Sequence, residues 1–146
     1  MPMKVFFALL FVLSAQVAIS QTYQNESKLI EYLGQEKFDQ LKAKGSGYLK
    51  FLDVRQSHGF AIMDYDAEKM SDFTVLNSVN KMNPNDKSVS QVSVDTFLSE
   101  INSGTINYLL YKFEWDQNSY TYYRLGSSGK VLVIYPNDYI TEMMNK

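Results

Sequence analysis

The C-terminal part of this 146-residue chain constrains its fold more than any other part. Three runs there are rich in Tyr, Val, Ile and Leu, which β-strands favour, and they cover Ile106 to Trp115, Ser119 to Leu125 and Lys130 to Tyr135. The segments between them, Asp116 to Asn118 and Gly126 to Gly129, consist of turn residues. This pattern predicts a three-stranded antiparallel β-meander.

The preceding half of the chain favours short helices. Apolar residues at helical spacing indicate a helix around Leu29 and Leu33 that Gly34 interrupts. A second helix is expected to end at Gly45, where a left-handed C-cap fits. A third is expected from about Tyr48 to Ser57.

The middle of the chain gives weaker patterns. Phe60 to Tyr65 alternates well enough for a strand, and Phe73 to Val79 is a weaker strand candidate. The polar stretch from Asn80 to Gln91 contains Asn-Pro-Asn-Asp and predicts a loop. A short helix follows, with Ser93 or Asp95 as its N-cap.

A short C-terminal helix completes the expected fold, with Pro136 ending the last strand and Asn137 capping the helix. Helices come first along the chain and strands later, an order typical of the α+β class. We therefore expect short N-terminal helices packed on a small antiparallel sheet that ends in the three-stranded β-meander.

The last hairpin determines which side chains share a face of the sheet. We expect Gly129 in the left-handed position of a three-residue turn with a bulge, so that Leu125 opposes Val131. A slip of one residue would move every side chain of a strand to the other face. The expected register groups these residues on one face: Tyr120, Tyr122, Arg124, Leu132 and Ile134.

We expect the Tyr120, Tyr122 and Arg124 row to form a partly exposed aromatic surface, while the N-terminal helices cover the opposite face. The alternative is a sheet covered on both sides, with only the tyrosine hydroxyls reaching its edge. Tyrosine is common in strands, so the sequence leaves both arrangements open.

Residues 1–20 are typical of an export signal. Lys4 supplies a positive start, Val5 to Leu13 is an apolar run too short to span a bilayer, and residues 18–20 form a small-x-small cleavage site. We expect a signal peptide over residues 1–20 and a single α+β domain over 21–146. The mature protein is then exported to the periplasm or the cell exterior.

Composition narrows the function classes. The chain has no cysteine, which excludes disulfides, thiolate nucleophiles and thiolate zinc sites. Its net charge of −2 gives no electrostatic reason to expect nucleic acid or an anionic membrane as partner. No pattern indicates a cofactor or a metal.

His58 is the only histidine, so a serine–histidine–carboxylate arrangement would have to use it, with Ser57 as a neighbouring hydroxyl. No Gly-x-Ser-x-Gly motif accompanies it. Its place at a predicted helix end favours an interaction with the helix dipole instead. A small secreted hydrolase that uses His58 is therefore an alternative rather than the leading hypothesis.

Carboxylates raise two further possibilities. A calcium loop would use Asp64, Asp66, Glu68 and Asp72, but the glycine that an EF-hand needs at its sixth position is replaced by Lys69, which favours a solvated turn. Glycoside hydrolysis needs two carboxylates facing each other, and the chain offers Glu100, Glu114 and Asp116. Their separation in space does not follow from the sequence.

The leading hypothesis is a small exported binding protein without catalytic activity. Its expected binding residues are Tyr120, Tyr122 and Arg124, because tyrosine gives rigid amphipathic contact area at low entropic cost. The partner is an unknown protein, peptide or glycan. A third alternative, an inhibitor of an extracellular enzyme, would need a rigid protruding loop, for which Asn83 to Asp86 is the candidate.

Overall fold

The computed structural model describes residues 22–146, and the predicted signal peptide lies outside these residues. The helices are α2 (Glu26–Leu33), α3 (Gln35–Ala43), α4 (Gly47–His58), α5 (Val94–Ser103) and α6 (Asn137–Met144), with a 3-10 turn η1 (Tyr108–Leu110). The strands are β1 (Phe60–Asp64), β2 (Thr74–Leu76), β3 (Ser78–Met82), β4 (Val89–Ser93), β5 (Tyr111–Lys112), β6 (Thr121–Leu125) and β7 (Lys130–Ile134). The predicted α+β class is confirmed.

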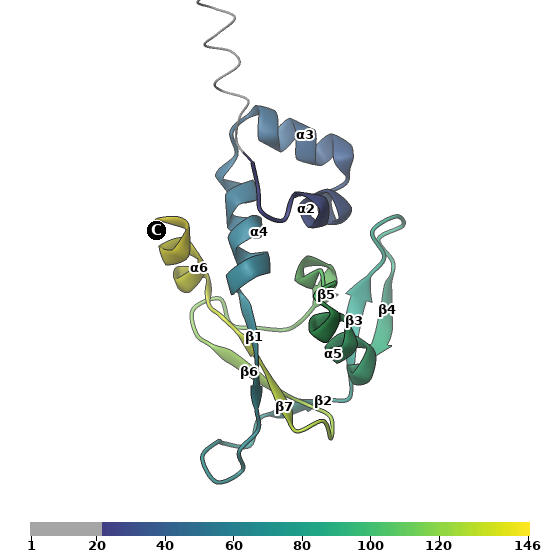
Figure 1. The fold of residues 1–146 in the computed structure, drawn as a ribbon, viewed down its shortest axis with the longest axis vertical. Coiled ribbons are helices and arrows are strands. Elements are labelled where there is room, and N and C mark those ends of the chain that lie inside the picture. Colours follow the sequence, from purple (N-terminus) through teal and green to yellow (C-terminus); the bar gives the residue numbers. More distant parts are fainter. Residues whose placement is uncertain (1–21) are drawn as a thin grey trace, which may run out of the picture.

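The strands form two sheets. Sheet A has the order β1-β7-β6-β2, with β2 parallel to β6 and the other neighbours antiparallel. Sheet B is antiparallel and has the order β4-β3-β5. Helices α2, α3 and α4 lie at one end of the molecule, while sheet B and α5 lie beside sheet A (Figure 1). None of the helices within residues 22–146 has the length and apolar character needed to cross a membrane.

The predicted helix ends are largely confirmed. Gly34 separates α2 from α3, and Gly45 after α3 has a φ of 63°. The Gly45 and Ser46 amides donate to the Lys42 and Leu41 carbonyls over 3.1 and 3.0 Å, which closes the helix in a Schellman motif. Ser93, rather than Asp95, is the N-cap of α5; both residues are candidates from the sequence. Asn137, by contrast, is the first residue of α6 and does not cap it.

The predicted three-stranded meander is wrong in its first strand. Only Tyr111 and Lys112 of the run from Ile106 to Trp115 are extended, and they pair with β3 of sheet B rather than with β6. The backbone groups that precede Tyr111 form hydrogen bonds with side chains. The Gln56 side chain bonds the Ile106 carbonyl and the Tyr108 amide, and Asn107 caps η1. Those backbone groups are therefore not free for a ladder of strand hydrogen bonds.

The predicted loop from Asn80 to Gln91 is also wrong, because most of it belongs to a hairpin. Strands β3 and β4 pair antiparallel with Asn80 opposite Gln91. Val79 and Met82 are both buried, on opposite faces of β3, and their apolar contacts help to hold an otherwise polar strand. The weak strand predicted from Phe73 to Val79 is in fact divided between sheets A and B.

The register of the β6–β7 hairpin differs by one residue from the predicted one. Leu125 pairs with Lys130, which leaves four residues in the turn, and both Gly126 and Gly129 have positive φ. Two left-handed glycines close the hairpin without the expected bulge. Arg124 therefore lies opposite Val131, and Tyr122 lies opposite Val133. The face that carries Tyr122 and Arg124 thus contains Val131 and Val133 instead of the predicted Leu132 and Ile134.

The core has two parts. In the larger part, Leu125, Leu132 and Ile134 on one face of sheet A pack against α5 and sheet B. The prediction that the N-terminal helices cover this face is wrong. Those helices form a smaller cluster of their own, which includes Leu29, Phe38 and Leu109. Buried hydrogen bonds from Gln56 and Asn107 join the two parts.

Candidate functional site

The face of sheet A that points away from α5 carries the predicted binding residues. We call it the outer face. Pairing of β6 with β2 and β7, and of β7 with β1, brings further side chains to the same face. The register also places Val131 and Val133 on this face, where both are buried. The other members that the argument uses are Met63, Phe73, Val75, Tyr120, Tyr122, Arg124 and Tyr135.

The outer face concentrates the exposed apolar surface of the protein. Tyr120 is 45% exposed and Tyr122 is 38% exposed, so the expectation of a partly exposed row is met at these two positions. Met63 and Val75 are exposed beside them. Together they are four of the six large apolar side chains that are exposed in residues 22–146.

Ring contacts hold these side chains in place. Tyr122 stacks on Phe73 with centroids 5.0 Å apart and planes 13° apart. Tyr120 meets the edge of Tyr135 at 5.2 Å, and Tyr135 contacts Tyr139 of α6 at 4.6 Å. Burial, followed by the nearby tyrosines, raises the pKa of Tyr135 above its ordinary value. The rings therefore form a set of mutually packed aromatic groups.

Arg124 adds a cation to the outer face. Its guanidinium carbon lies 4.2 Å from the centre of the Tyr65 ring, a cation–π contact. The Nε atom is buried without a hydrogen-bond partner. No carboxylate among the described residues forms an ion pair with Arg124, so its charge is not neutralised by a direct partner.

The acidic segment beside the outer face does not converge on one point. Asp64 pairs with Lys130, and Asp66 pairs with Lys69 at 3.8 Å and accepts a hydrogen bond from the Glu68 amide. Within residues 22–146, no three His, Cys, Asp or Glu side chains gather closely enough to hold a metal ion. The segment is a charged turn at the edge of sheet A.

His58 is exposed at the end of α4, where it makes no hydrogen bond or ion pair with any described residue. The neighbouring Ser57 hydroxyl accepts a hydrogen bond from Asn25 over 2.8 Å. The pair therefore lacks the oriented base and carboxylate that nucleophilic catalysis needs.

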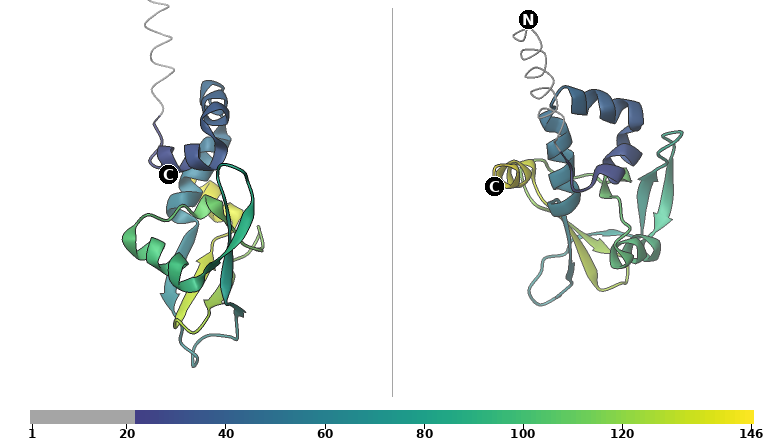
Figure 2. Two further views of the ribbon diagram at one scale, coloured as in Figure 1. Left: turned by 90° about the vertical axis from the view of Figure 1, so that its right-hand side faces the viewer. Right: turned by 45° about the horizontal axis from the view of Figure 1, so that its top comes forward.

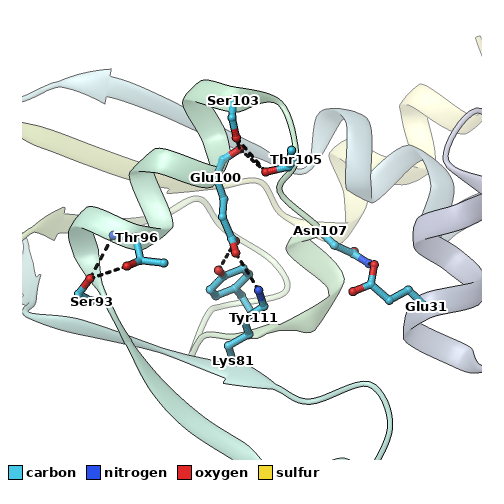
Figure 3. Close-up of polar contacts among 9 residues, drawn as sticks. All are labelled: Glu31, Lys81, Ser93, Thr96, Glu100, Ser103, Thr105, Asn107 and Tyr111. Carbon is cyan, nitrogen blue, oxygen red and sulfur yellow. Dashed lines mark hydrogen bonds and ion pairs between the residues drawn. The ribbon is translucent and has the colours of Figure 1, made fainter.

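Glu100 is committed to a structural network (Figure 3). One of its oxygens accepts from Lys81 over 2.8 Å, and the other accepts from the Tyr111 hydroxyl. Burial first, and Glu100 second, raise the pKa of Tyr111 far above its ordinary value. This network ties α5 to sheet B and engages both carboxylate oxygens of Glu100, so neither is free for acid–base catalysis with another carboxylate. Glu114 and Asp116 lie exposed on the loop after β5.

The segment from Asn83 to Asp86 lies at the tip of the β3–β4 hairpin, which projects from the body of the protein (Figures 1 and 2). Its turn is internally bonded: the Asn85 amide donates to the Asn83 side chain over 2.8 Å, and the Ser88 amide donates to Asp86 over 2.9 Å. Lys87 reaches the Tyr32 carbonyl of α2 at 3.1 Å. The tip is thus an ordered protrusion.

Sequence reasoning missed Met63, Val75 and Phe73 as members of the outer face. The alternation of Phe60 to Tyr65 could have placed Met63 on one side of a strand. Val75 and Phe73 join the face only through the parallel pairing of β2 with β6, for which the sequence carries no local signal.

A comparison with protein-family models, with curated proteins and with solved structures finds no match for this chain. Function therefore has to be inferred from the geometry of the described residues.

Proposed function

We propose that this chain is a binding protein without catalytic activity, and that it contacts a protein partner through the outer face of sheet A. The observation that carries the proposal is the gathering of Met63, Val75, Tyr120 and Tyr122, all exposed, on one sheet face. Protein interfaces are enriched in Tyr, Met and Arg, and their strongest contacts are often Tyr and Arg. We further propose that residues 1–20 export the protein to the periplasm or the exterior.

The stacked rings favour binding because their motion is already restricted. A side chain that is free to rotate loses entropy when a partner immobilises it. Tyr122 already packs against Phe73, and Tyr120 already packs against Tyr135, which restricts the positions open to both rings. A flat partner surface can therefore cover them at low entropic cost.

Charge beside the outer face suggests the chemistry of the partner. Asp66, Glu68 and Asp72 lie in the segment between β1 and β2, with Lys69 as its cation, and Asp64 at the end of β1 pairs with Lys130. A partner with an apolar centre and Lys or Arg at its rim complements this arrangement. Rim charges of this kind act mainly on the rate of association and on specificity.

The test compares partner capture by two folded variants. Tyr120→Ala/Tyr122→Ala removes the central rings of the outer face, and Val89→Ala removes an exposed apolar side chain on β4. Captured proteins from the envelope and medium of the producing cell are purified and measured for binding to each variant. We expect the double variant to lose a partner that Val89→Ala keeps. Equal binding by both variants, each folded by circular dichroism, would refute the proposal.

The ordered hairpin tip supports a second candidate, an inhibitor that inserts Asn83 to Asp86 into an enzyme. Asn85→Ala/Asp86→Ala alters the tip without touching the outer face. Loss of partner binding in this variant, together with retained binding in Tyr120→Ala/Tyr122→Ala, would assign the contact to the tip.

A further inference from the structure

A pocket lies where the N-terminal helices meet the two sheets, away from the outer face. We call it the junction pocket. Its volume is about 300 Å³, and its walls come from α2, α4, β1, the segment 108–117 and the start of α6. Most of its lining side chains are aromatic, among them Tyr32, Phe60 and Trp115. Ligand pockets span about 300 to 1,000 Å³, so this one is matched to a small molecule.

The charges of the junction pocket are all of one sign. Arg55 and Lys112 line it, and no Asp or Glu is among its lining residues. Most charged side chains near a protein interior are paired, because an unpaired charge loses hydration without compensation. Lys112 is exposed, so this argument applies to Arg55. An aromatic pocket that holds a half-buried, unpaired arginine and no described carboxylate is therefore suited to an anion.

Arg55 is the group that such an anion would meet. Its guanidinium carbon lies 3.9 Å from the centre of the Trp115 ring and 5.2 Å from that of Phe60. Its Nη1 atom is buried without a partner, and the side chain forms no hydrogen bond or ion pair with any described residue. Burial lowers the pKa of Arg55 to about 10, which still leaves the side chain charged at neutral pH.

A second unpaired polar atom belongs to the same wall. Asn137, at the first position of α6, has a buried Oδ1 with no hydrogen-bond partner. Its backbone amide donates to the Gln117 carbonyl over 2.9 Å, which holds α6 against the loop that carries Trp115. Two of the three unpaired buried side-chain atoms in residues 22–146 thus belong to lining residues of one pocket. Only the Arg55 Nη1 is a donor that an anion could use, because the Asn137 Oδ1 is an acceptor.

We propose that the junction pocket binds a small carboxylate with a flat apolar body, which Arg55 holds by its carboxylate and the aromatic rings hold by its body. A guanidinium stacked on a ring keeps its N–H edge free for the two parallel hydrogen bonds that a carboxylate accepts. The aromatic walls favour an apolar body over a bare oxyanion such as phosphate. This inference does not depend on the proposed protein contact of the outer face.

Trp115 provides a direct reporter, because it is the only tryptophan of the chain and lines the pocket. The probes are benzoate and phenylacetate, with benzamide as the neutral match of benzoate and inorganic phosphate as the anion without an apolar body. We expect both carboxylates to change Trp115 fluorescence in a saturable way at millimolar concentration. Benzamide and phosphate should bind at least about tenfold more weakly, because benzamide lacks the carboxylate and phosphate lacks the apolar body.

Variants locate the binding. Arg55→Met keeps a long apolar side chain against Trp115 and removes the charge, so benzoate affinity should fall about tenfold or more. Arg55→Lys keeps the charge without the planar fork and should give an intermediate affinity. Arg124→Met changes the other arginine of the chain, which stacks on Tyr65 outside the pocket, and should bind benzoate as the wild type does.

Saturation-transfer NMR on the benzoate protons repeats the measurement without relying on fluorescence, which Arg55 substitutions alter directly. Thermal melts confirm that each variant is folded. The proposal is overturned by any of three results: benzoate fails to bind the wild type at millimolar concentration, benzamide or phosphate binds as tightly as benzoate, or folded Arg55→Met retains wild-type affinity.

Discussion

The outer face of sheet A and the junction pocket each contain one of the chain's two arginines. Arg124 stacks on Tyr65 on an open sheet face, and Arg55 stacks on Trp115 in the wall of a pocket. Each has a buried nitrogen without a partner. An arginine stacked on an aromatic ring thus occurs both on a sheet face and in a pocket wall. The surroundings determine the size of ligand that fits: a sheet face suits a protein partner, and a pocket suits a small molecule.

The two regions also differ in how they bear on folding. Tyr120 and Tyr122 of the outer face are partly exposed. The junction pocket is lined by residues from both parts of the core, among them Leu109 and Phe60. Substitutions near the pocket should therefore affect stability strongly, and substitutions on the outer face should affect binding more than stability.

The largest expected effect is that of Gln56→Leu on stability. Gln56 donates to the Ile106 carbonyl over 3.0 Å in a buried bond and accepts from the Tyr108 amide over 2.8 Å in a partly buried one. Their loss leaves two backbone groups unsatisfied, which should lower the free energy of unfolding by about 2–4 kcal/mol in urea titrations. Gln40→Leu on the exposed side of α3 is the control and should change it by less than about 0.5 kcal/mol. A Gln56→Leu protein as stable as the control would contradict this role.

The next effect separates the two binding regions. Tyr120→Ala/Tyr122→Ala should weaken partner binding by about 2 kcal/mol, roughly 30-fold, because central tyrosines of an interface often contribute that much. The same variant should bind benzoate normally, and Arg55→Met should bind the partner normally. Calorimetric titration of both ligands against both variants checks this. If either variant lost both ligands while folded, the two regions would not be independent.

Stability at alkaline pH should show whether Tyr108, which lines the junction pocket, titrates differently from an exposed tyrosine. Burial raises the pKa of Tyr108 to about 12 from 10.0, so above pH 10 the unfolded chain releases a proton that the folded chain keeps. The stability that this group contributes is complete below pH 10 and is lost as the pH rises through about 12. The Arg55 contribution to stability has the opposite dependence on pH. The pKa of Arg55 is lowered to about 10, so its contribution increases as the pH rises through that value.

Tyr108→Phe isolates the tyrosine contribution. Urea midpoints measured at neutral pH and above pH 10 should fall less in Tyr108→Phe than in the wild type, because the variant has no proton to lose there. Equal falls in both proteins would show that burial does not hold this proton.

The smallest expected effect concerns the charged edge of the outer face. Asp66→Asn/Glu68→Gln removes two exposed charges and should leave stability within about 0.5 kcal/mol of the wild type. It should slow association with the partner and weaken the dependence of that rate on salt. Stopped-flow association at low and high salt checks this, with benzoate binding as the unaffected control. An unchanged salt dependence would exclude a role for this edge in recognition.

Local signals in the sequence were sufficient for part of the fold. The glycines that end the helices, and the alternation that keeps Tyr120, Tyr122 and Arg124 on one face, depend on neighbours in the chain. The first strand of the meander failed because Gln56, distant in sequence, bonds the backbone at Ile106 and Tyr108. The hairpin register failed because it depends on the conformation of the Gly126 to Gly129 turn.

The candidate sites divide in the same way. The placement of Tyr120 and Tyr122 on one face was predictable from the alternation along the chain, but their exposure was not, because it depends on which other elements cover that face. The junction pocket was not, because its walls come from segments far apart in the chain. Arg55 could be singled out as one of two arginines, but its contact with Trp115 arises only when α4 and the loop after β5 come together.

Site-specific photo-crosslinking in the producing cell tests the central claim most directly. A photoreactive phenylalanine analogue is placed at Tyr122 or Val75 on the outer face, or at the exposed Val89 on sheet B. We expect one discrete protein adduct at both outer-face positions and none at Val89. Adducts at Val89 alone, or none at Tyr122 and Val75 in folded protein, would contradict the assignment of the outer face as the contact surface.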